Sequence, residues 1–88
     1  MKAPLTVSYD EGRPFAAYFR LTRREGDRVE RSDPREAGLV VDLAADGRPI
    51  GIEITEPREL DLATFNRILT SFGLEPVDAS ALAPLTAA

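Results

Sequence analysis

The sequence predicts a small α+β protein, in which an antiparallel β-meander of about four to five strands is covered on one face by a C-terminal helix. Two observations predict this class. Between residues 5 and 54, apolar residues alternate with polar ones in short runs separated by turn residues, the pattern of half-buried strands. Between residues 61 and 72, the period changes to that of an amphipathic helix. The length of 88 residues suits one domain, residues 1–88.

A hairpin over residues 38–54, GLVVDLAADGRPIGIEI, is the most clearly patterned part of the chain. Asp46-Gly47 suits the two positive φ angles of a type I′ turn, so we expect Ala45 and Arg48 to close the hairpin. This register gathers aliphatic side chains on one face as the pairs Leu43–Ile50, Val41–Ile52 and Leu39–Ile54. A shift by one residue would bury acidic side chains in their place, so the register is strongly specified.

Earlier runs predict the remaining strands of the sheet. Leu5, Val7 and Tyr9 alternate with hydroxyl side chains, and turn residues follow at positions 10–14. The run over residues 15–22 alternates again, and we assign to the core its face with Phe15, Ala17, Phe19 and Leu21. Residues 28–32 predict a short polar edge strand that is ended by Asp33-Pro34.

The predicted helix over residues 61–72 has an apolar stripe and recognisable ends. Asp61 is placed to cap its first turn, Gly73 suits the left-handed residue that closes a helix, and Pro76 prevents continuation. We expect this helix to lie on the sheet. Residues 78–88 predict a short helical turn or a frayed tail, because their Ala and Pro content offers little to anchor.

The composition excludes several function classes. The chain has neither Cys nor His, so disulfides, thiolate metal sites and a cysteine nucleophile are excluded, along with the commonest general base and zinc ligand. A net charge of −4 disfavours nonspecific attraction to nucleic acid and to anionic membranes. The chain shows neither a secretory signal nor a membrane-spanning apolar run, so we expect a cytoplasmic protein without a membrane partner.

Two groups of residues carry a family resemblance. The first is Tyr9-Asp10 followed by the aromatic strand Tyr18, Arg20 and Leu21. The second is the strand 40–43, the turn Asp46-Gly47-Arg48 and the strand 51–54, read as Val-Val-Asp-Leu, Asp-Gly-Arg and Gly-Ile-Glu-Ile. In these residues, over roughly 5–54, the chain resembles the domain of unknown function 2283 family of small bacterial proteins. The resemblance implies no activity, cofactor or binding residue. Some members look like partners of small toxin-like proteins, which implies an antitoxin-like role as one hypothesis.

The sheet face turned away from the predicted core is the candidate interaction face, formed by Tyr18, Arg20, Val40, Asp42, Gly51 and Glu53. It is less polar than a fully solvated face needs to be, so a partner or a second copy is expected to cover it. Small residues such as Gly51 would allow a close approach. We predict no catalytic residue, metal ligand or cofactor in the chain.

Three functional hypotheses follow. The first is a noncatalytic protein-interaction module that self-associates or binds another small protein, through this face or the polar edge at residues 28–32. The second is a metal-dependent hydrolase or other enzyme using Asp42 and Glu53 as a carboxyl pair, although no nucleophile or third oxygen ligand accompanies them. The third is nucleic-acid binding through the arginines of residues 20–35, which interspersed acids leave almost neutral.

Overall fold

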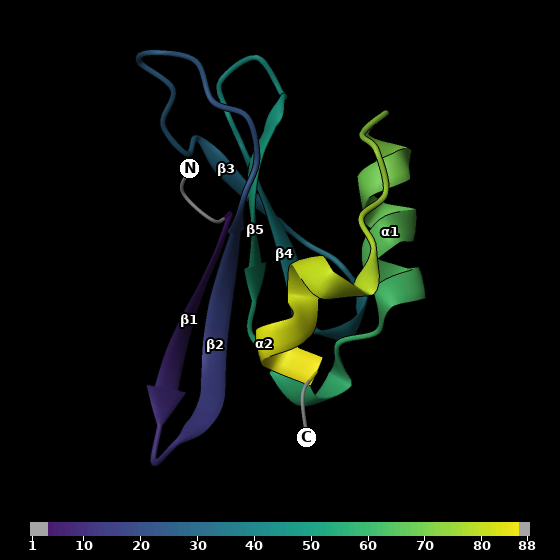
Figure 1. The fold of residues 1–88 in the computed structure, drawn as a ribbon. Coiled ribbons are helices and arrows are strands. Elements are labelled where there is room, and N and C mark those ends of the chain that lie inside the picture. Colours follow the sequence, from purple (N-terminus) through teal and green to yellow (C-terminus); the bar gives the residue numbers. More distant parts are fainter. Residues whose placement is uncertain (1–3, 87–88) are drawn as a thin grey trace.

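The computed structural model describes residues 4–86, which form one five-stranded antiparallel sheet with helices on one of its faces (Figure 1). The strands are β1 (Leu5–Asp10), β2 (Arg13–Arg20), β3 (Arg31–Pro34), β4 (Leu39–Leu43) and β5 (Pro49–Ile54). The α-helices are α1 (Leu62–Ser71) and α2 (Ala83–Thr86), and three 3₁₀ turns lie at Glu36–Gly38, Pro57–Glu59 and Ala79–Leu82. The predicted α+β class is confirmed. None of the helices within residues 4–86 is long and apolar enough to cross a membrane.

The strand order is β1-β2-β5-β4-β3, so the sheet differs from a plain meander. After β2 the chain crosses to the far edge through residues 21–30, forms β3 there, and returns through β4 and β5 to pair with β2. The central position of β5 explains why its apolar residues are among the most buried of the chain. Tyr18 of β2 thereby becomes the neighbour of Glu53.

The β4–β5 hairpin is present, but its turn differs from the predicted type. The Ala44 N–H donates to the Arg48 carbonyl and the Gly47 N–H donates to the Ala44 carbonyl, each at 2.9 Å. Of residues 45–47, only Gly47 has a positive φ, of 88°. The loop is therefore three residues long and ends in a left-handed glycine, a common alternative to the two-residue type I′ turn. The predicted closure by Ala45 and Arg48 is wrong.

A bulge in β5 restores the predicted register beyond the turn. Leu43 pairs with Pro49 and Asp42 pairs with Gly51, which leaves Ile50 as the extra residue. The predicted pair Leu43–Ile50 is therefore wrong, whereas Val41–Ile52 and Leu39–Ile54 are confirmed. Ile50 is fully buried but lies outside the main core cluster.

The β1–β2 hairpin has the type of turn that was predicted for β4–β5. Glu11 and Gly12 both have positive φ, of 50° and 79°, and connect the paired residues Asp10 and Arg13. This hairpin extends past the end of β5, because β2 pairs with β5 only over residues 17–20 (Figure 1). Phe15 is consequently 65% exposed, so its predicted place in the core is wrong.

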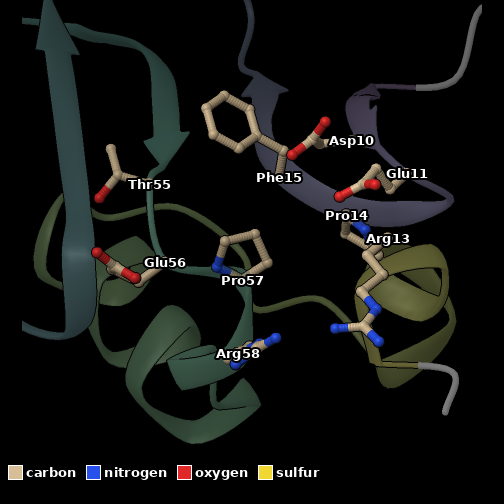
Figure 2. Close-up of a pocket in the computed structure, with 9 residues that line it drawn as sticks. All are labelled: Asp10, Glu11, Arg13, Pro14, Phe15, Thr55, Glu56, Pro57 and Arg58. Atoms are coloured by element: carbon tan, nitrogen blue, oxygen red, sulfur yellow. The ribbon is translucent and has the colours of Figure 1, made fainter.

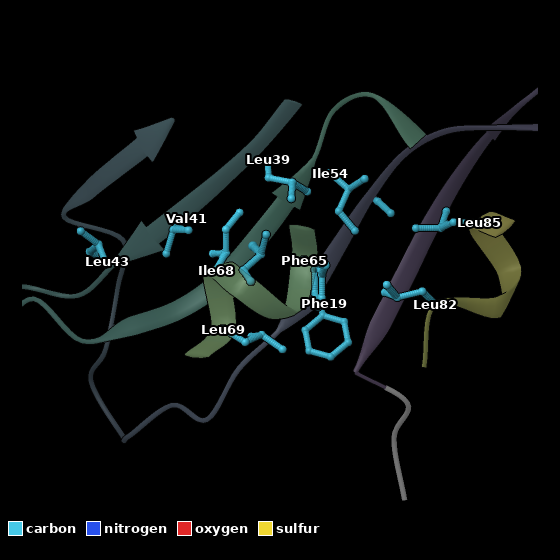
Figure 3. Close-up of a cluster of buried hydrophobic side chains, with 12 residues drawn as sticks. Phe19, Leu39, Val41, Leu43, Ile54, Phe65, Ile68, Leu69, Leu82 and Leu85 are labelled. Carbon is cyan, nitrogen blue, oxygen red and sulfur yellow. The ribbon is translucent and has the colours of Figure 1, made fainter. Parts of the chain in front are cut away.

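The core lies between the sheet and α1. The rings of Phe19 and Phe65 meet edge to face with centroids 5.1 Å apart, and aliphatic side chains of β4, β5 and α1 surround them (Figure 3). Leu82 and Leu85 join the same cluster and are 1% and 8% exposed. The predicted short helical turn is therefore present over residues 79–86, and the alternative of a frayed tail is wrong there. Residues 87–88 lie outside the described part.

The helix α1 begins and ends as its sequence predicts. The Asp61 carboxylate accepts the Thr64 N–H at 3.2 Å, and this bond and the Thr64 hydroxyl hold the pKa of Asp61 below its usual value. At the other end the Leu74 N–H donates to the Leu69 carbonyl and the Gly73 N–H to the Thr70 carbonyl, each at 3.0 Å. These two bonds form a Schellman motif.

Gly73 has a φ of 75°, and no atom lies near the position of an added Cβ. We therefore expect Gly73→Ala to destabilise the protein by about 1 kcal/mol through backbone strain alone. Gly73→Asn, which tolerates this conformation better, is the matched control and should cost less. Urea unfolding of the two variants measures the difference, and equal losses would contradict the assignment.

The edge strand β3 begins three residues later than the predicted strand over residues 28–32, and it ends two residues later. Pro34 lies inside it rather than ending it, because the hydrogen-bonded pairs with β4 are the odd-numbered residues of β3. The bond from the Arg35 N–H to the Leu39 carbonyl at 2.7 Å fixes this alternation. Pro34 therefore lies where its missing N–H would point outward from the sheet.

Candidate functional site

The open face is the face of the sheet turned away from the helices, and its centre is a polar cluster around Asp42. Tyr18 of β2 lies across Gly51 of β5, and any side chain at position 51 would meet the end of its ring. From there the Tyr18 hydroxyl donates to Asp42 Oδ2 at 3.0 Å. The space above Gly51, which the sequence suggested for a partner's close approach, is thus filled by the chain's own tyrosine.

Asp42 is 4% exposed, although it lies on the sheet face turned away from the core. Tyr18 covers it from one side, and Ser32 of β3 donates its hydroxyl to Asp42 Oδ1 at 2.8 Å from the other. A buried carboxyl group is costly unless it receives hydrogen bonds, and these two donors meet that need. Asp42 is therefore covered by side chains of its own chain.

Glu53 lies next to Asp42 on the open face, where it is half-buried and pairs with Tyr18 and Val40. The hydrogen bond to Asp42 raises the pKa of Glu53 to about 7, and burial and the neighbouring charge act in the same direction. Glu53 therefore keeps its proton up to about neutral pH. The protonated Glu53 donates toward Asp42, which also accepts the hydroxyl groups of Tyr18 and Ser32.

Arg23 closes the cluster on its solvent side. Its Nη2 donates to the Tyr18 hydroxyl at 2.8 Å, its Nε donates to the Ile50 carbonyl at 3.2 Å, and its guanidinium lies 5.9 Å from the centre of the Tyr18 ring. Burial, and then the hydrogen bond to Asp42, raise the pKa of Tyr18 above its usual value. The tyrosine is therefore a hydrogen-bond donor throughout the physiological range.

The predicted interaction face is assembled as expected in most of its members. Tyr18, Val40, Asp42, Gly51 and Glu53 are brought together by the pairing of β2, β5 and β4. Arg20 lies on the same face but reaches outward, and its Nη1 donates to Thr6 Oγ1 of β1 at 3.0 Å.

The carboxyl pair of Asp42 and Glu53 was the candidate for metal or acid–base chemistry. Within residues 4–86, no three acidic side chains gather in a way that would hold a metal ion. Tyr18 and Ser32 already occupy the oxygens of Asp42. The arrangement can hold and exchange a proton, but it offers no open coordination position beside a nucleophile.

The arginines of residues 20–35 do not form one basic surface. Arg23 lies on the open face over Tyr18, whereas Arg35 forms an ion pair with Asp33 at 3.0 Å and lies 5.1 Å from the ring of Phe72, at the end of α1. The acids of the segment also bind outside it, since Asp27 receives two hydrogen bonds from Arg48 at 2.8 and 3.1 Å. A phosphate-binding stripe would require these guanidinium groups to face one way.

A second candidate site, which the sequence did not predict, is the hairpin-end pocket. It has a volume of about 680 Å³ and lies between the turn of the β1–β2 hairpin and the chain after β5 (Figure 2). Its lining is Asp10, Glu11, Arg13, Pro14, Phe15, Thr55, Glu56, Pro57 and Arg58. The sequence signal for this pocket was a charged turn followed by Pro14 and Phe15. The alternating pattern assigned Phe15 to the core instead.

The fold and the open face define a small α+β domain whose central polar cluster is satisfied within the chain. Residues 16–56 match the model of the family described as "Protein of unknown function (DUF2283)", which supports the family resemblance found in the sequence. The matched segment runs from β2 to the end of β5 and contains Tyr18, Asp42, Gly51 and Glu53, but neither β1 nor α1. No curated protein and no solved structure matches the chain significantly.

Proposed function

We propose that the protein is a noncatalytic interaction module that self-associates by pairing the β1 strands of two copies. The observation that carries this proposal is the difference between the two edges of the sheet. One edge is β1, with six residues, and the other is β3, with four. An unprotected edge strand offers its backbone groups to another strand, and proteins usually block such edges.

The β1 edge has free backbone groups at alternate residues. The Arg20 N–H donates to the Pro4 carbonyl at 2.8 Å, so the residues of β1 with even numbers bond to β2. The N–H and C=O groups of Leu5 and Val7 therefore point outward from the sheet. Between Leu5 and Tyr9 the strand holds no proline and no charged side chain that would block pairing.

The β3 edge is blocked by comparison. Its outward positions are Ser32 and Pro34, and the proline has no N–H to offer. Arg31 and Asp33 place charges along this short strand. The polar edge that the sequence suggested as an interaction site is therefore the less suitable of the two.

A second copy of the chain fits the β1 edge because the strand is nearly symmetric about Val7. An antiparallel pair centred on Val7 places Thr6 opposite Ser8 and Leu5 opposite Tyr9. Apolar side chains then continue the helix-covered face, and hydroxyl side chains continue the open face. Such a contact is isologous and extends the sheet across both copies.

The carboxyl cluster supports a noncatalytic role. Asp42 is buried and receives its hydrogen bonds from Tyr18 and Ser32, an arrangement that fixes the register of three strands. An enzyme using this pair would need a substrate to displace Tyr18 from Gly51. An antitoxin-like role would use the same edge with a strand of another protein in place of the second copy.

Light scattering coupled to size-exclusion chromatography, over a wide range of concentration, tests this proposal. We expect a dimer, and we expect Val7→Pro to weaken it by at least about 10-fold while leaving the monomer folded, because the lost N–H points outward. Val7→Thr keeps that N–H and is the matched control. A monomer at all concentrations, or a dimer unaffected by Val7→Pro, would refute β1 pairing.

A further inference from the structure

The hairpin-end pocket is lined by charged side chains that have no partners within residues 4–86. Five charged residues line it, and none forms an ion pair or a side-chain hydrogen bond with any other residue of 4–86: Asp10, Glu11, Arg13, Glu56 and Arg58. In a second groove, of about 450 Å³, Arg48 is already bound by Asp27 and Asp46. Charged groups without partners in a concave site are available to a ligand.

The charges of the pocket are separated by sign. Figure 2 shows the guanidinium groups of Arg13 and Arg58 pointing toward one another, while the carboxylates of Asp10 and Glu11 lie apart from them beside the hairpin turn. Two facing guanidinium groups repel each other, and a carboxylate placed between them receives charge-assisted hydrogen bonds from both. The acidic side of the pocket favours an ammonium group for the same reason.

An exposed aromatic ring adds an apolar surface to the pocket. Phe15 is 65% exposed in the pocket wall, next to Pro14 and close to Pro57. Large apolar side chains exposed beside charged groups are typical of binding sites rather than of solvated surface. The two prolines restrict the backbone on both sides, so the walls are already placed before a ligand arrives.

We propose that the hairpin-end pocket binds a short peptide by its two charged ends, with an apolar side chain lying on Phe15. The free carboxylate lies between Arg13 and Arg58, and the ammonium group lies toward Asp10 and Glu11. The volume of about 680 Å³ falls within the usual range of small-ligand sites, which extends over about 300–1,000 Å³. This site shares only Asp10, the last residue of β1, with the β1 edge, and the proposed contacts with the peptide do not require a second copy of the chain.

Titration of the ¹⁵N-labelled protein with glycyl-phenylalanine, followed by amide chemical shifts, tests the proposal. The lining groups are exposed, so we expect a dissociation constant of about 1–10 mM, with shifts at Phe15 and Thr55. Acetylation of the probe's amine and amidation of its carboxylate should each weaken binding about 3- to 10-fold. No shift at these amides up to about 20 mM would overturn the proposal.

Variants assign each end of the peptide. Arg13→Gln and Arg58→Gln should each weaken glycyl-phenylalanine about 3- to 10-fold but leave the amidated probe unchanged. Asp10→Asn should weaken the unmodified probe but not the acetylated one. Arg28→Gln, an exposed arginine outside the pocket, is the matched control. If the arginine variants bind all three probes like the wild type, the carboxylate assignment is wrong. If Asp10→Asn binds them all like the wild type, the ammonium assignment is wrong.

Discussion

Replacing Gly51 by alanine is expected to lower the free energy of unfolding by about 2–3 kcal/mol, despite adding a single methyl group. The new Cβ would occupy the space where the end of the Tyr18 ring now lies. Tyr18 would have to move and would lose its bond to Asp42, leaving a buried carboxyl group with one donor fewer. Gly51 has no left-handed φ, so the backbone itself accepts alanine without strain. Urea unfolding measures the loss.

A double-mutant cycle separates this collision from other effects of the substitution. In a Tyr18→Ala background, the ring is absent and Gly51→Ala should cost less than about 0.5 kcal/mol. Tyr18→Phe keeps the ring but removes the hydroxyl, so it reports the hydrogen bond to Asp42 alone. If Gly51→Ala costs the same with and without the tyrosine, Tyr18 does not lie over Gly51 in solution.

The β4–β5 hairpin shows what local pattern can and cannot predict. Alternation fixed the pairs Val41–Ile52 and Leu39–Ile54, because a shift would exchange aliphatic for acidic side chains over the whole strand. The turn type was not determined in the same way, since Asp46-Gly47 suits both a two-residue turn and a three-residue loop ending in Gly47. The bulge at Ile50 then restores the register, so an incorrect turn led to a mostly correct pairing.

The buried position of Asp42 had no signal within its own strand. It depends on Tyr18 and Ser32, which become its neighbours only because the chain crosses from β2 to β3 before returning through β4 and β5. Sequence alternation identifies the face of a strand, but it does not say which strands lie beside it. The face was therefore predicted correctly, whereas its burial and its hydrogen bonds were not.

Phe15 and Leu82 illustrate the same limit for the core. Both lie in segments whose burial depends on where other elements end: β5 and the helices stop short of Phe15, while the tail folds back far enough to bury Leu82. The local sequence predicts a buried Phe15, because it is an aromatic residue in an alternating run, and a weakly packed Leu82, because it stands among alanines. In both cases the actual burial depends on how far the neighbouring elements extend in space.

The stability of the protein is expected to fall between about pH 5 and pH 8, because of Glu53. Its pKa is about 7 in the folded protein against 4.5 for the free side chain. Below pH 4.5 both states carry the proton; as the pH rises, the unfolded chain loses it first, so stability decreases until Glu53 also ionises in the folded state. Since Glu53 is only half-buried, we expect a loss of about 1–3 kcal/mol across this range.

The composition isolates this effect from other titrations. The chain has no histidine, and the pKa values of Asp27, Asp46 and Asp61 are held below their usual value, so these groups titrate at lower pH.

Glu53→Gln keeps a donor for Asp42 at every pH, so it should remove most of the pH dependence of stability. At pH 8 it should be more stable than the wild type by about 1–3 kcal/mol. Glu25→Gln, in the exposed loop after β2, is the control and should retain it. Unfolding free energies of the three proteins at pH 5, 6.5 and 8 decide the matter. A wild type as stable at pH 8 as at pH 5 would mean that Glu53 does not keep its proton up to neutral pH in the folded protein.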